Sequence, residues 1–188
     1  MGQDIKLTAS DNFQLGAYRA DPAGSPKGAV VVIQEIFGVN HHIRSVCDRI
    51  AREGYVAIAP SIFDRTSPNF QSGYTPDEIA EARKFVASPD WDAMLRDTRA
   101  AIGYYGGAVV RFADEKPKVP TQLHFGEKDA GIPLTDVETI KAKRPDLEVF
   151  VYAGAQHGFH CDERASYDKT SADIAWPRSM AFFAKHLK

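Results

Sequence analysis

Near its C-terminal end the chain reads Leu123-His124-Phe125-Gly126-Glu127-Lys128-Asp129, a predicted strand followed at once by an acidic residue. A second stretch, Ala155-Gln156-His157-Gly158-Phe159, places a histidine after the next predicted strand. One large group of hydrolases carries its catalytic triad in the chain order nucleophile, acid, histidine, with each member after a strand. The order here therefore predicts that Asp129 and His157 are the acid and the base of such a triad.

Strands and helices are predicted to alternate around these stretches, which favours an α/β fold with a largely parallel sheet. The apolar run from Ala29 to Ile33 has the pattern of a strand covered on both faces. Asn40 is predicted to cap the next helix, and Thr75 with Glu78 to form the capping box of another. The remaining predicted elements are a hairpin of residues 5–10 and 13–20, strands at 55–59, 119–125 and 148–153, a short strand ending at 103–107, and helices at 88–101, 135–143 and 173–187.

The size and composition indicate an ordinary globular protein. At 188 residues the chain is expected to form a single domain, residues 1–188. A net charge of −2 gives no electrostatic reason to expect nucleic acid or an anionic membrane as a partner. We find no secretory signal and no apolar run of the roughly 18 residues that span a membrane. The two cysteines, Cys47 and Cys161, fit free thiols in a reducing compartment, so we expect a cytoplasmic protein.

Four stretches, in the order in which they occur, resemble the dienelactone hydrolase family, whose members have the α/β-hydrolase fold. They are Gln34-Glu35-Ile36-Phe37-Gly38, Gly103-Tyr104-Tyr105-Gly106, Phe125-Gly126-Glu127-Lys128-Asp129 and Gln156-His157-Gly158-Phe159. The resemblance covers nearly the whole chain. It implies an α/β-hydrolase-like, mostly parallel sheet with helices on both faces. It also implies hydrolysis of a small-molecule ester or lactone without a cofactor or a metal ion.

One large part of the family's pattern is missing from this sequence. Ahead of the Gly103 strand the family carries a strand, a sharp G-x-C-x-G-G turn with the nucleophilic cysteine, and a helix. This chain contains no G-x-S-x-G or G-x-C-x-G segment, and Ala100-Ala101-Ile102 fits both the end of the preceding helix and the start of that strand. A strand-plus-helix crossover needs about 30 residues. We therefore expect one central βα unit, and the nucleophile with it, to be absent, with a deletion junction near residues 99–103.

The resemblance implies roles for the site residues that remain. His157 would take the proton of the nucleophile, and Asp129 would hold the imidazole in the required tautomer. Glu35 would be a supporting carboxylate that tunes the nucleophile. The backbone N–H of Ile36 would donate one hydrogen bond to the oxyanion. For Glu35, an ordinary charge at a strand end is the competing interpretation.

Two arginines are candidates for binding a substrate carboxylate. Family members that act on dienelactone are expected to hold its carboxylate with arginines, one of them shortly after the histidine. Here Arg164 is displaced from that place, and Arg83 lies on the helix that begins after Thr75. Both also fit solvated surface charges, so dienelactone itself is not expected as the specific substrate.

Other nucleophiles and a metal site fit the sequence less well. Cys47 lies on the apolar stripe of its helix, which indicates burial. Cys161 lies close after His157, on the same short loop. Ser61 follows a predicted strand but lacks the flanking glycines of a tight elbow. The run from His157 to Asp162 contains zinc-binding residue types, yet no second Cys/His pair stands at the spacing of a structural site.

Taken together, the residues predict an ester or lactone hydrolase by family that is inactive or impaired for lack of a nucleophile. One alternative is a non-catalytic binding or interaction protein on a hydrolase scaffold. Another is that the sequence is an incomplete version of an active hydrolase. The sequence leaves open whether the protein is a monomer or a homodimer.

Overall fold

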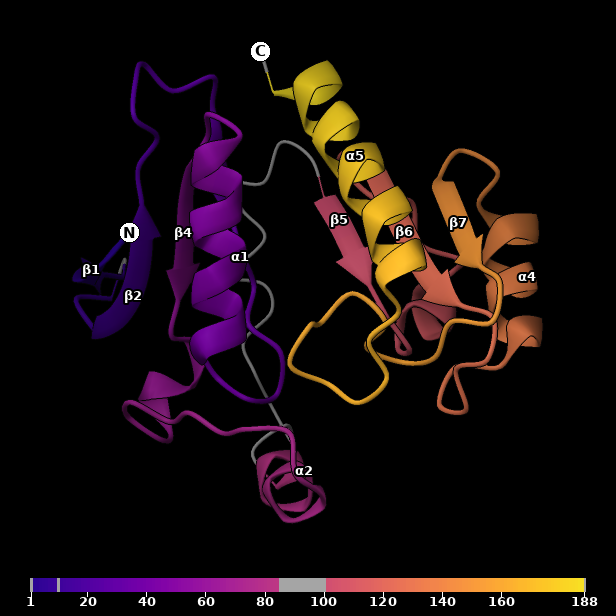
Figure 1. Ribbon diagram of the computed structural model, residues 1–188, viewed down its shortest axis with the longest axis horizontal. Coiled ribbons are helices and arrows are strands. Elements are labelled where there is room, and N and C mark those ends of the chain that lie inside the picture. Colours follow the sequence, from indigo (N-terminus) through magenta and orange to yellow (C-terminus); the bar gives the residue numbers. More distant parts are fainter. Residues whose placement is uncertain (1, 10, 85–100, 188) are drawn as a thin grey trace. The chain divides into compact units, whose positions relative to one another are not determined.

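The computed structural model describes residues 2–9, 11–84 and 101–187 (Figure 1). They belong to two compact units, Met1–Asp97 and Thr98–Lys188, called here the N-terminal and the C-terminal unit. Residues 88–100 of the helix expected at 88–101, and residues 99 and 100 of the junction expected at 99–103, lie outside the described residues. Residues 101–103 are described and belong to a strand, Ala101–Tyr104. The single domain over residues 1–188 stays a prediction. Among the described helices, none has the length and apolar character needed to cross a membrane.

The N-terminal unit contains a sheet of four strands: β1 (Gln3–Thr8), β2 (Gln14–Ala20), β3 (Ala29–Val31) and β4 (Val56–Pro60). Their order across the sheet is β1-β2-β4-β3. β1 and β2 form the expected antiparallel hairpin, whose turn contains Asn12 at a φ of 67°. Asparagine tolerates this left-handed conformation better than most residues. β2 pairs antiparallel with β4, and β4 pairs parallel with β3.

β3 differs from its expected environment. The apolar run that contains it predicted a strand covered on both faces, but Val31 is 54% exposed and Ile33 is 39% exposed. β3 is an edge strand, and β4 is its one partner among the described strands. The prediction was wrong because an apolar run reports the polarity of the residues and not which strands lie beside them.

α1 (His41–Arg52) begins where the sequence predicts. The side chain of Asn40 accepts a hydrogen bond from the N–H of Ile43 at 3.2 Å, as an N-cap does. Gly54 follows the helix at a φ of 96°, the left-handed conformation that ends many helices. The helix turns one side towards the core with the buried residues His42, Ile43, Cys47, Ile50 and Ala51.

Two further helices follow β4: the short 3-10 helix η1 (Ile62–Arg65) and α2 (Pro76–Arg83). The N–H of Glu78 donates to the hydroxyl of Thr75 at 3.3 Å. The carboxylate of Glu78 in turn accepts from the N–H of Thr75 at 3.0 Å. This reciprocal pair confirms the predicted capping box at the start of α2.

The C-terminal unit contains three parallel strands in the order β5 (Ala101–Tyr104), β6 (Thr121–Gly126) and β7 (Glu148–Tyr152). Its helices are η2 (Val109–Phe112), α4 (Leu134–Lys143) and α5 (Lys169–His186). α5 begins earlier than predicted, because Asp168 caps it by accepting a hydrogen bond from the N–H of Ser171 at 2.6 Å.

α4 and α5 lie on opposite faces of this sheet (Figure 1). Leu123 and Phe125 of β6 pack in a core cluster with the buried side chains of α4. His124, the residue between them, points the other way, and its Nε2 lies 3.4 Å from Oγ of Ser179 in α5. Successive side chains of a strand point to opposite faces. The C-terminal unit therefore has the predicted α/β arrangement, parallel strands with helices on both faces.

Candidate active site

Asp129 lies in the loop that leaves the carboxyl end of β6. Its side chain is fully buried. Oδ1 accepts a hydrogen bond from the backbone N–H of Gly131 at 2.8 Å. This bond fixes one carboxylate oxygen and leaves Oδ2 available for a second partner.

That second partner is His157, in the loop that follows β7. Its Nδ1 lies 2.8 Å from Oδ2 of Asp129, so the structure brings together the two residues singled out from the sequence. The His157 side chain is 44% exposed, whereas that of Asp129 is 0% exposed. Because a carboxylate only accepts hydrogen bonds, Nδ1 carries the proton and Nε2 keeps its lone pair in the neutral ring. The pair thus has the geometry of a base with its orienting acid.

The loop around His157 is tightly folded. Gly158 has a φ of 80°, and a Cβ on this residue would lie 2.7 Å from Cδ of Arg164. Both the conformation and the close contact favour glycine here. The hydroxyl of Ser166 donates to the backbone carbonyl of His157 at 2.6 Å. These contacts fix the backbone from which the imidazole projects.

Tyr105 reaches the same loop from the end of β5. Its ring centroid lies 5.2 Å from that of His157, with 48° between the ring planes. Its hydroxyl accepts a hydrogen bond from the N–H of His160 at 2.9 Å. Tyr105 also has a φ of 52°, which is unusual for a residue other than glycine and is often found near functional sites. Tyr105 belongs to one of the four stretches that resemble the family, but its place in the sequence predicts no role for it.

A buried polar network lies beside this loop, centred on His124. Its Nδ1 is 2.7 Å from the hydroxyl of Tyr152, and its Nε2 is 2.8 Å from Oε1 of Gln122. Burial lowers the pKa of His124 to about 3, and the charges of His160 and Arg178 add to this effect. His124 is therefore a neutral member of the core. The sequence offered one signal for it, a histidine between the apolar residues Leu123 and Phe125 of a strand.

Glu35 and Ile36 belong to the N-terminal unit, in the turn between β3 and α1. The hydroxyl of Tyr74 donates to Oε2 of Glu35 at 3.3 Å. Gly38 closes the turn at a φ of 76°, and a Cβ there would lie 2.1 Å from the carbonyl oxygen of Phe70. Only glycine fits this position. The roles of Glu35 and Ile36 towards a nucleophile and an oxyanion stay predictions.

Comparison with known proteins connects these features to a family. The model described as "Dienelactone hydrolase family" matches residues 15–105 and, separately, residues 91–187. The chain belongs to the dienelactone hydrolase family. The resemblance seen in the four sequence stretches is thereby confirmed. Residues 91–105 belong to both of these matches.

Curated relatives of this dienelactone hydrolase family member have similar names. A "putative carboxymethylenebutenolidase" of Synechocystis sp. is 34% identical, and the comparison covers 100% of each chain. That comparison extends over 246 positions although this chain has 188 residues, so at least 58 positions have a residue only in the relative. An Escherichia coli protein with the same description is 29% identical and covers 94% of this chain and 84% of its own length.

Solved structures confirm the α/β-hydrolase-like fold. The crystal structure of a "putative dienelactone hydrolase" from Klebsiella pneumoniae has a TM-score of 0.80 at 28% identity and covers 99% of both chains. A dienelactone hydrolase-like promiscuous phosphotriesterase from metagenomic libraries has a TM-score of 0.70 at 16% identity, covering 100% of this chain and 99% of its own. The second likeness concerns the fold alone.

The two candidate arginines of this dienelactone hydrolase family member belong to different units. Arg83 occupies the last turn of α2 in the N-terminal unit and is exposed. Arg164 lies in the C-terminal unit, where its side chain packs against Gly158 in the histidine loop. Arg164 thus contributes to the shape of this loop, and substrate binding by either arginine stays a prediction.

The side chains considered as replacement nucleophiles are poorly suited to that role. Cys47 is fully buried in α1, and this burial raises the pKa of its thiol to about 12. Cys161 is also fully buried. Ser61 precedes η1, and its N–H donates to the carbonyl of Gly16 at 2.8 Å in a turn without a left-handed glycine elbow.

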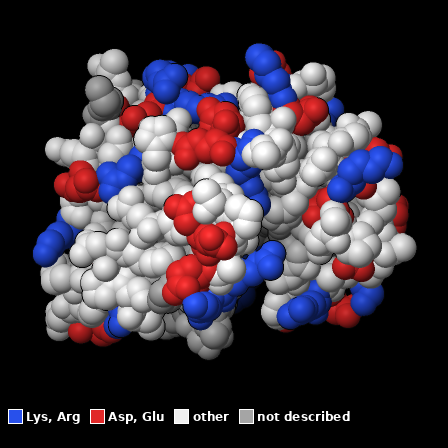
Figure 2. Space-filling view, turned by 60° about the horizontal axis from the view of Figure 1, so that its bottom comes forward, with Lys and Arg blue, Asp and Glu red and all other residues white. Residues whose placement is uncertain are grey.

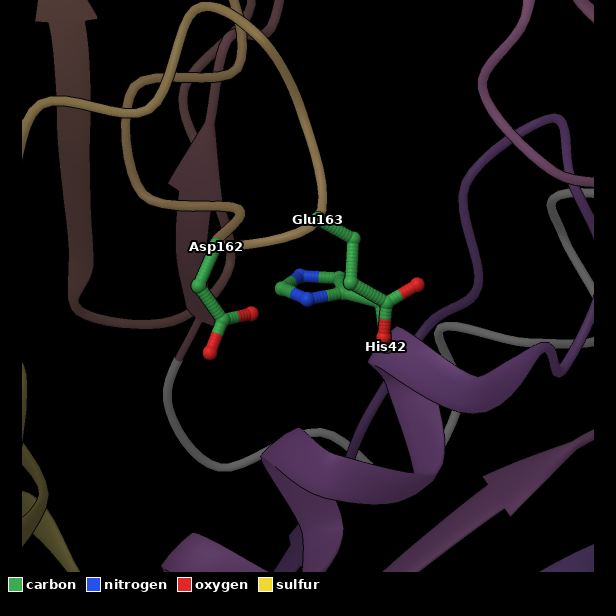
Figure 3. Close-up of side chains that lie close together, drawn as sticks. All are labelled: His42, Asp162 and Glu163. Atoms are coloured by element: carbon green, nitrogen blue, oxygen red, sulfur yellow. The ribbon is translucent and has the colours of Figure 1, made fainter.

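Charged side chains of both signs occur over the face drawn in Figure 2, in keeping with the net charge of −2. Two of the acidic residues, Asp162 and Glu163, are exposed neighbours in the loop after His157 (Figure 3). Figure 3 also draws His42, from the first turn of α1 in the N-terminal unit. Exposed acidic groups commonly occur without a metal ion, so we assign none to these carboxylates.

Proposed function

We propose that this family member is an ester or lactone hydrolase scaffold that keeps its acid–base pair and lacks its nucleophile. In this proposal Asp129 orients the imidazole and His157 is the base. The observation that carries it is the 2.8 Å contact between Nδ1 of His157 and the buried carboxylate of Asp129. The chain is then inactive or strongly impaired towards ordinary esters.

Several observations support the absence of a central βα unit near residues 99–103. The sequence has no G-x-C-x-G segment, and at least 58 positions of the comparison with the Synechocystis relative have a residue only in the relative. The two matches to the family model overlap at 91–105, around the expected junction. In the N-terminal unit β3 is an edge strand, and in the C-terminal unit β5 is an edge strand. Each is parallel to its one described neighbour, so each offers an edge to which a further parallel strand can pair.

The absence of the nucleophile is expected to lower the rate of ester hydrolysis strongly. Removing the nucleophile of a triad lowers kcat by on the order of 10⁶-fold in a well-studied protease. The proposal keeps Glu35 as the supporting carboxylate and the N–H of Ile36 as one oxyanion donor. Arg83 and Arg164 remain candidates for binding a substrate carboxylate.

The proposed substrate is a small-molecule ester or lactone, and neither nucleic acid nor a membrane is proposed as a partner. The proposal places the protein in the cytoplasm. It treats residues 1–188 as a single domain with a deletion junction near residues 99–103. It requires no cofactor or metal ion and is compatible with a monomer or a homodimer.

An ester assay tests the proposal. We expect the full chain to release p-nitrophenol from p-nitrophenyl acetate far more slowly than the Synechocystis relative does. The residual rate is expected to fall in His157→Ala and in Asp129→Asn. Turnover comparable to that of the relative would contradict the loss of the nucleophile.

A graft tests the missing unit directly. The segment of the Synechocystis relative that has no counterpart here is inserted at the expected junction, between Arg99 and Gly103. The rate at which this graft hydrolyses p-nitrophenyl acetate is expected to exceed that of the original chain by several orders of magnitude. The matched control carries the same insertion with alanine in place of the nucleophilic cysteine that the family resemblance leads us to expect there. A folded graft without added activity would count against the proposal.

Two measurements separate the alternatives. Intact mass spectrometry of the expressed protein is expected to give 20.7 kDa, and a much larger mass would show that the sequence is an incomplete version of an active enzyme. No His157-dependent ester turnover at all would favour a non-catalytic binding protein on the hydrolase scaffold.

A further inference from the structure

We propose that His157 itself is a nucleophile towards activated acyl compounds in this chain, chiefly aryl esters and acyl phosphates. The inference rests on the proposed function, because it requires the acid–base pair to be intact and the cysteine of the family to be absent. It adds a covalent acyl-histidine step that the family's triad does not use.

The geometry of the pair leaves the reactive nitrogen of His157 accessible. Nδ1 donates to the carboxylate of Asp129 at 2.8 Å, which leaves the lone pair of the neutral ring on Nε2. Among the described residues of the C-terminal unit, the contacts of His157 use Nδ1, the backbone carbonyl and the ring face beside Tyr105, and none uses Nε2. The side chain is 44% exposed, so solvent reaches part of the imidazole, and the inference takes the acyl compound to approach Nε2 from that side.

The surroundings hold the ring in one orientation. The ring of Tyr105 lies 5.2 Å from that of His157, and Gly158 holds the tight turn at a φ of 80°. Asp129 is fixed in turn by the N–H of Gly131 at 2.8 Å. A nucleophile that is already oriented loses less conformational freedom in the transition state than a mobile side chain does.

The buried carboxylate of Asp129 favours the charge that acylation creates. Attack by Nε2 on a carbonyl carbon makes the ring an acyl-imidazolium that still carries the Nδ1 proton. A hydrogen bond from a charged donor to a carboxylate is stronger than one between neutral groups. Asp129 therefore stabilises the acylated ring more than it stabilises the neutral ring, which lowers the barrier to acylation.

The reaction proceeds in two steps. In the first, the bond between Nε2 and the acyl carbon forms, the bond from that carbon to the aryloxide oxygen breaks, and the aryloxide leaves with the electron pair. In the second, water attacks the acyl carbon, the C–N electron pair returns to Nε2, and the proton of the water passes to solvent. Together the steps consume one ester and one water and yield one carboxylic acid and one phenol.

The leaving group sets the substrate class. Imidazole leaves a tetrahedral intermediate more readily than an alkoxide does, so attack on an alkyl ester reverts to the starting ester. An activated aryloxide such as p-nitrophenolate, or a phosphate, is a weak enough base to leave in competition with imidazole, so attack on an activated aryl ester or an acyl phosphate goes forward. Histidine is one of the side chains that form covalent intermediates in enzymes. The inference thus predicts turnover of p-nitrophenyl acetate and none of ethyl acetate.

The test uses the full chain with p-nitrophenyl acetate and added hydroxylamine. After rapid acid quenching and peptide mapping we expect an acetyl group on His157. Hydroxylamine is expected to divert product to acetohydroxamate without raising the His157-dependent rate of p-nitrophenol release, which is the native rate minus that of the His157→Gln variant. The enzyme-dependent release of p-nitrophenol is expected to be lost in His157→Gln. In Asp129→Asn its rate is expected to fall by roughly 10- to 100-fold, because this factor corresponds to the free energy of one charged hydrogen bond. His186→Gln is the matched control, a histidine of the same unit outside the pair, and is expected to leave release unchanged.

The outcomes separate the inference from the proposed function. Release that depends on His157 but shows no acetyl-histidine, and that hydroxylamine accelerates, would show a general base and overturn the covalent step while the proposed function stands. An acetyl group on another residue would overturn the inference as well. Absence of any His157-dependent release would overturn the inference and leave the proposed function in place, because that proposal expects an inactive or strongly impaired chain.

Discussion

The ring of Tyr105 lies beside the ring of His157, with 5.2 Å between their centroids. The same tyrosine accepts a hydrogen bond from the N–H of His160 through its hydroxyl. One side chain from the end of β5 therefore supports both the imidazole and the backbone of its loop.

Replacing Tyr105 by phenylalanine is expected to loosen the histidine loop. The substitution removes the acceptor of the 2.9 Å bond from His160 and should cost about 1 kcal/mol of unfolding free energy. The exchange broadening of the His157 ring signals in NMR spectra is expected to increase. Tyr104→Phe is the matched control, because that hydroxyl bonds Oγ of Ser179 in α5 at 2.7 Å. Equal effects of the two substitutions on His157 would contradict the assignment.

Stability is expected to fall as the solution becomes mildly acidic, because His124 is held neutral in the fold. Its folded pKa of about 3 lies below the value of 6.5 expected in the unfolded chain, so the unfolded chain binds a proton first as the pH falls. The stability that the neutral His124 contributes to the fold is fully present above pH 6.5 and is lost as the pH falls from 6.5 to about 3. The free energy of unfolding by urea should drop by about 2 kcal/mol from this group between pH 7 and pH 5.

His124→Gln isolates this contribution. Glutamine retains a donor and an acceptor for the hydroxyl of Tyr152 and the side chain of Gln122, and it does not titrate. The variant is expected to be less stable than the native chain at pH 7 and to lose less stability on acidification. The same loss in both proteins would show that other groups cause the pH dependence.

The thiol of Cys47 is expected to resist modification in the folded protein. It is fully buried, and its pKa of about 12 keeps it protonated at pH 8. Ellman's reagent should therefore leave Cys47 unreacted in the native protein and react with both cysteines in urea. Rapid native reaction that peptide mapping locates at Cys47 would contradict this burial.

The edge formed by β3 is expected to promote self-association. Val31 is 54% exposed on an edge strand, and such edges pair readily with other chains. Val31→Lys should reduce the concentration-dependent growth in particle size seen by light scattering. Ile174→Lys, which introduces the same charge at an apolar residue 46% exposed on α5, is the control. An equal reduction in both variants would point to net charge and not to the strand edge.

Local signals in the sequence predicted the starts of α1 and α2 and the acid–histidine order, because each depends on residues close in the chain. The cap at Asn40 and the box of Thr75 and Glu78 are satisfied by their own neighbours. The exposure of Val31 and the contacts of Tyr105 depend instead on which strands and loops lie alongside. That information is not contained in hydrophobic periodicity, so the sequence reading of β3 was wrong and Tyr105 received no role.

The position of Asp129 and His157 after adjacent strands of one sheet has a consequence for how such a protein changes over time. The geometry of the pair depends on β6, β7 and the tyrosine at the end of β5, all within the C-terminal unit. If the cysteine is lost as we propose, the acid and the histidine therefore keep their positions. An oriented imidazole would then remain without the cysteine, as a starting point from which a different chemistry can be selected.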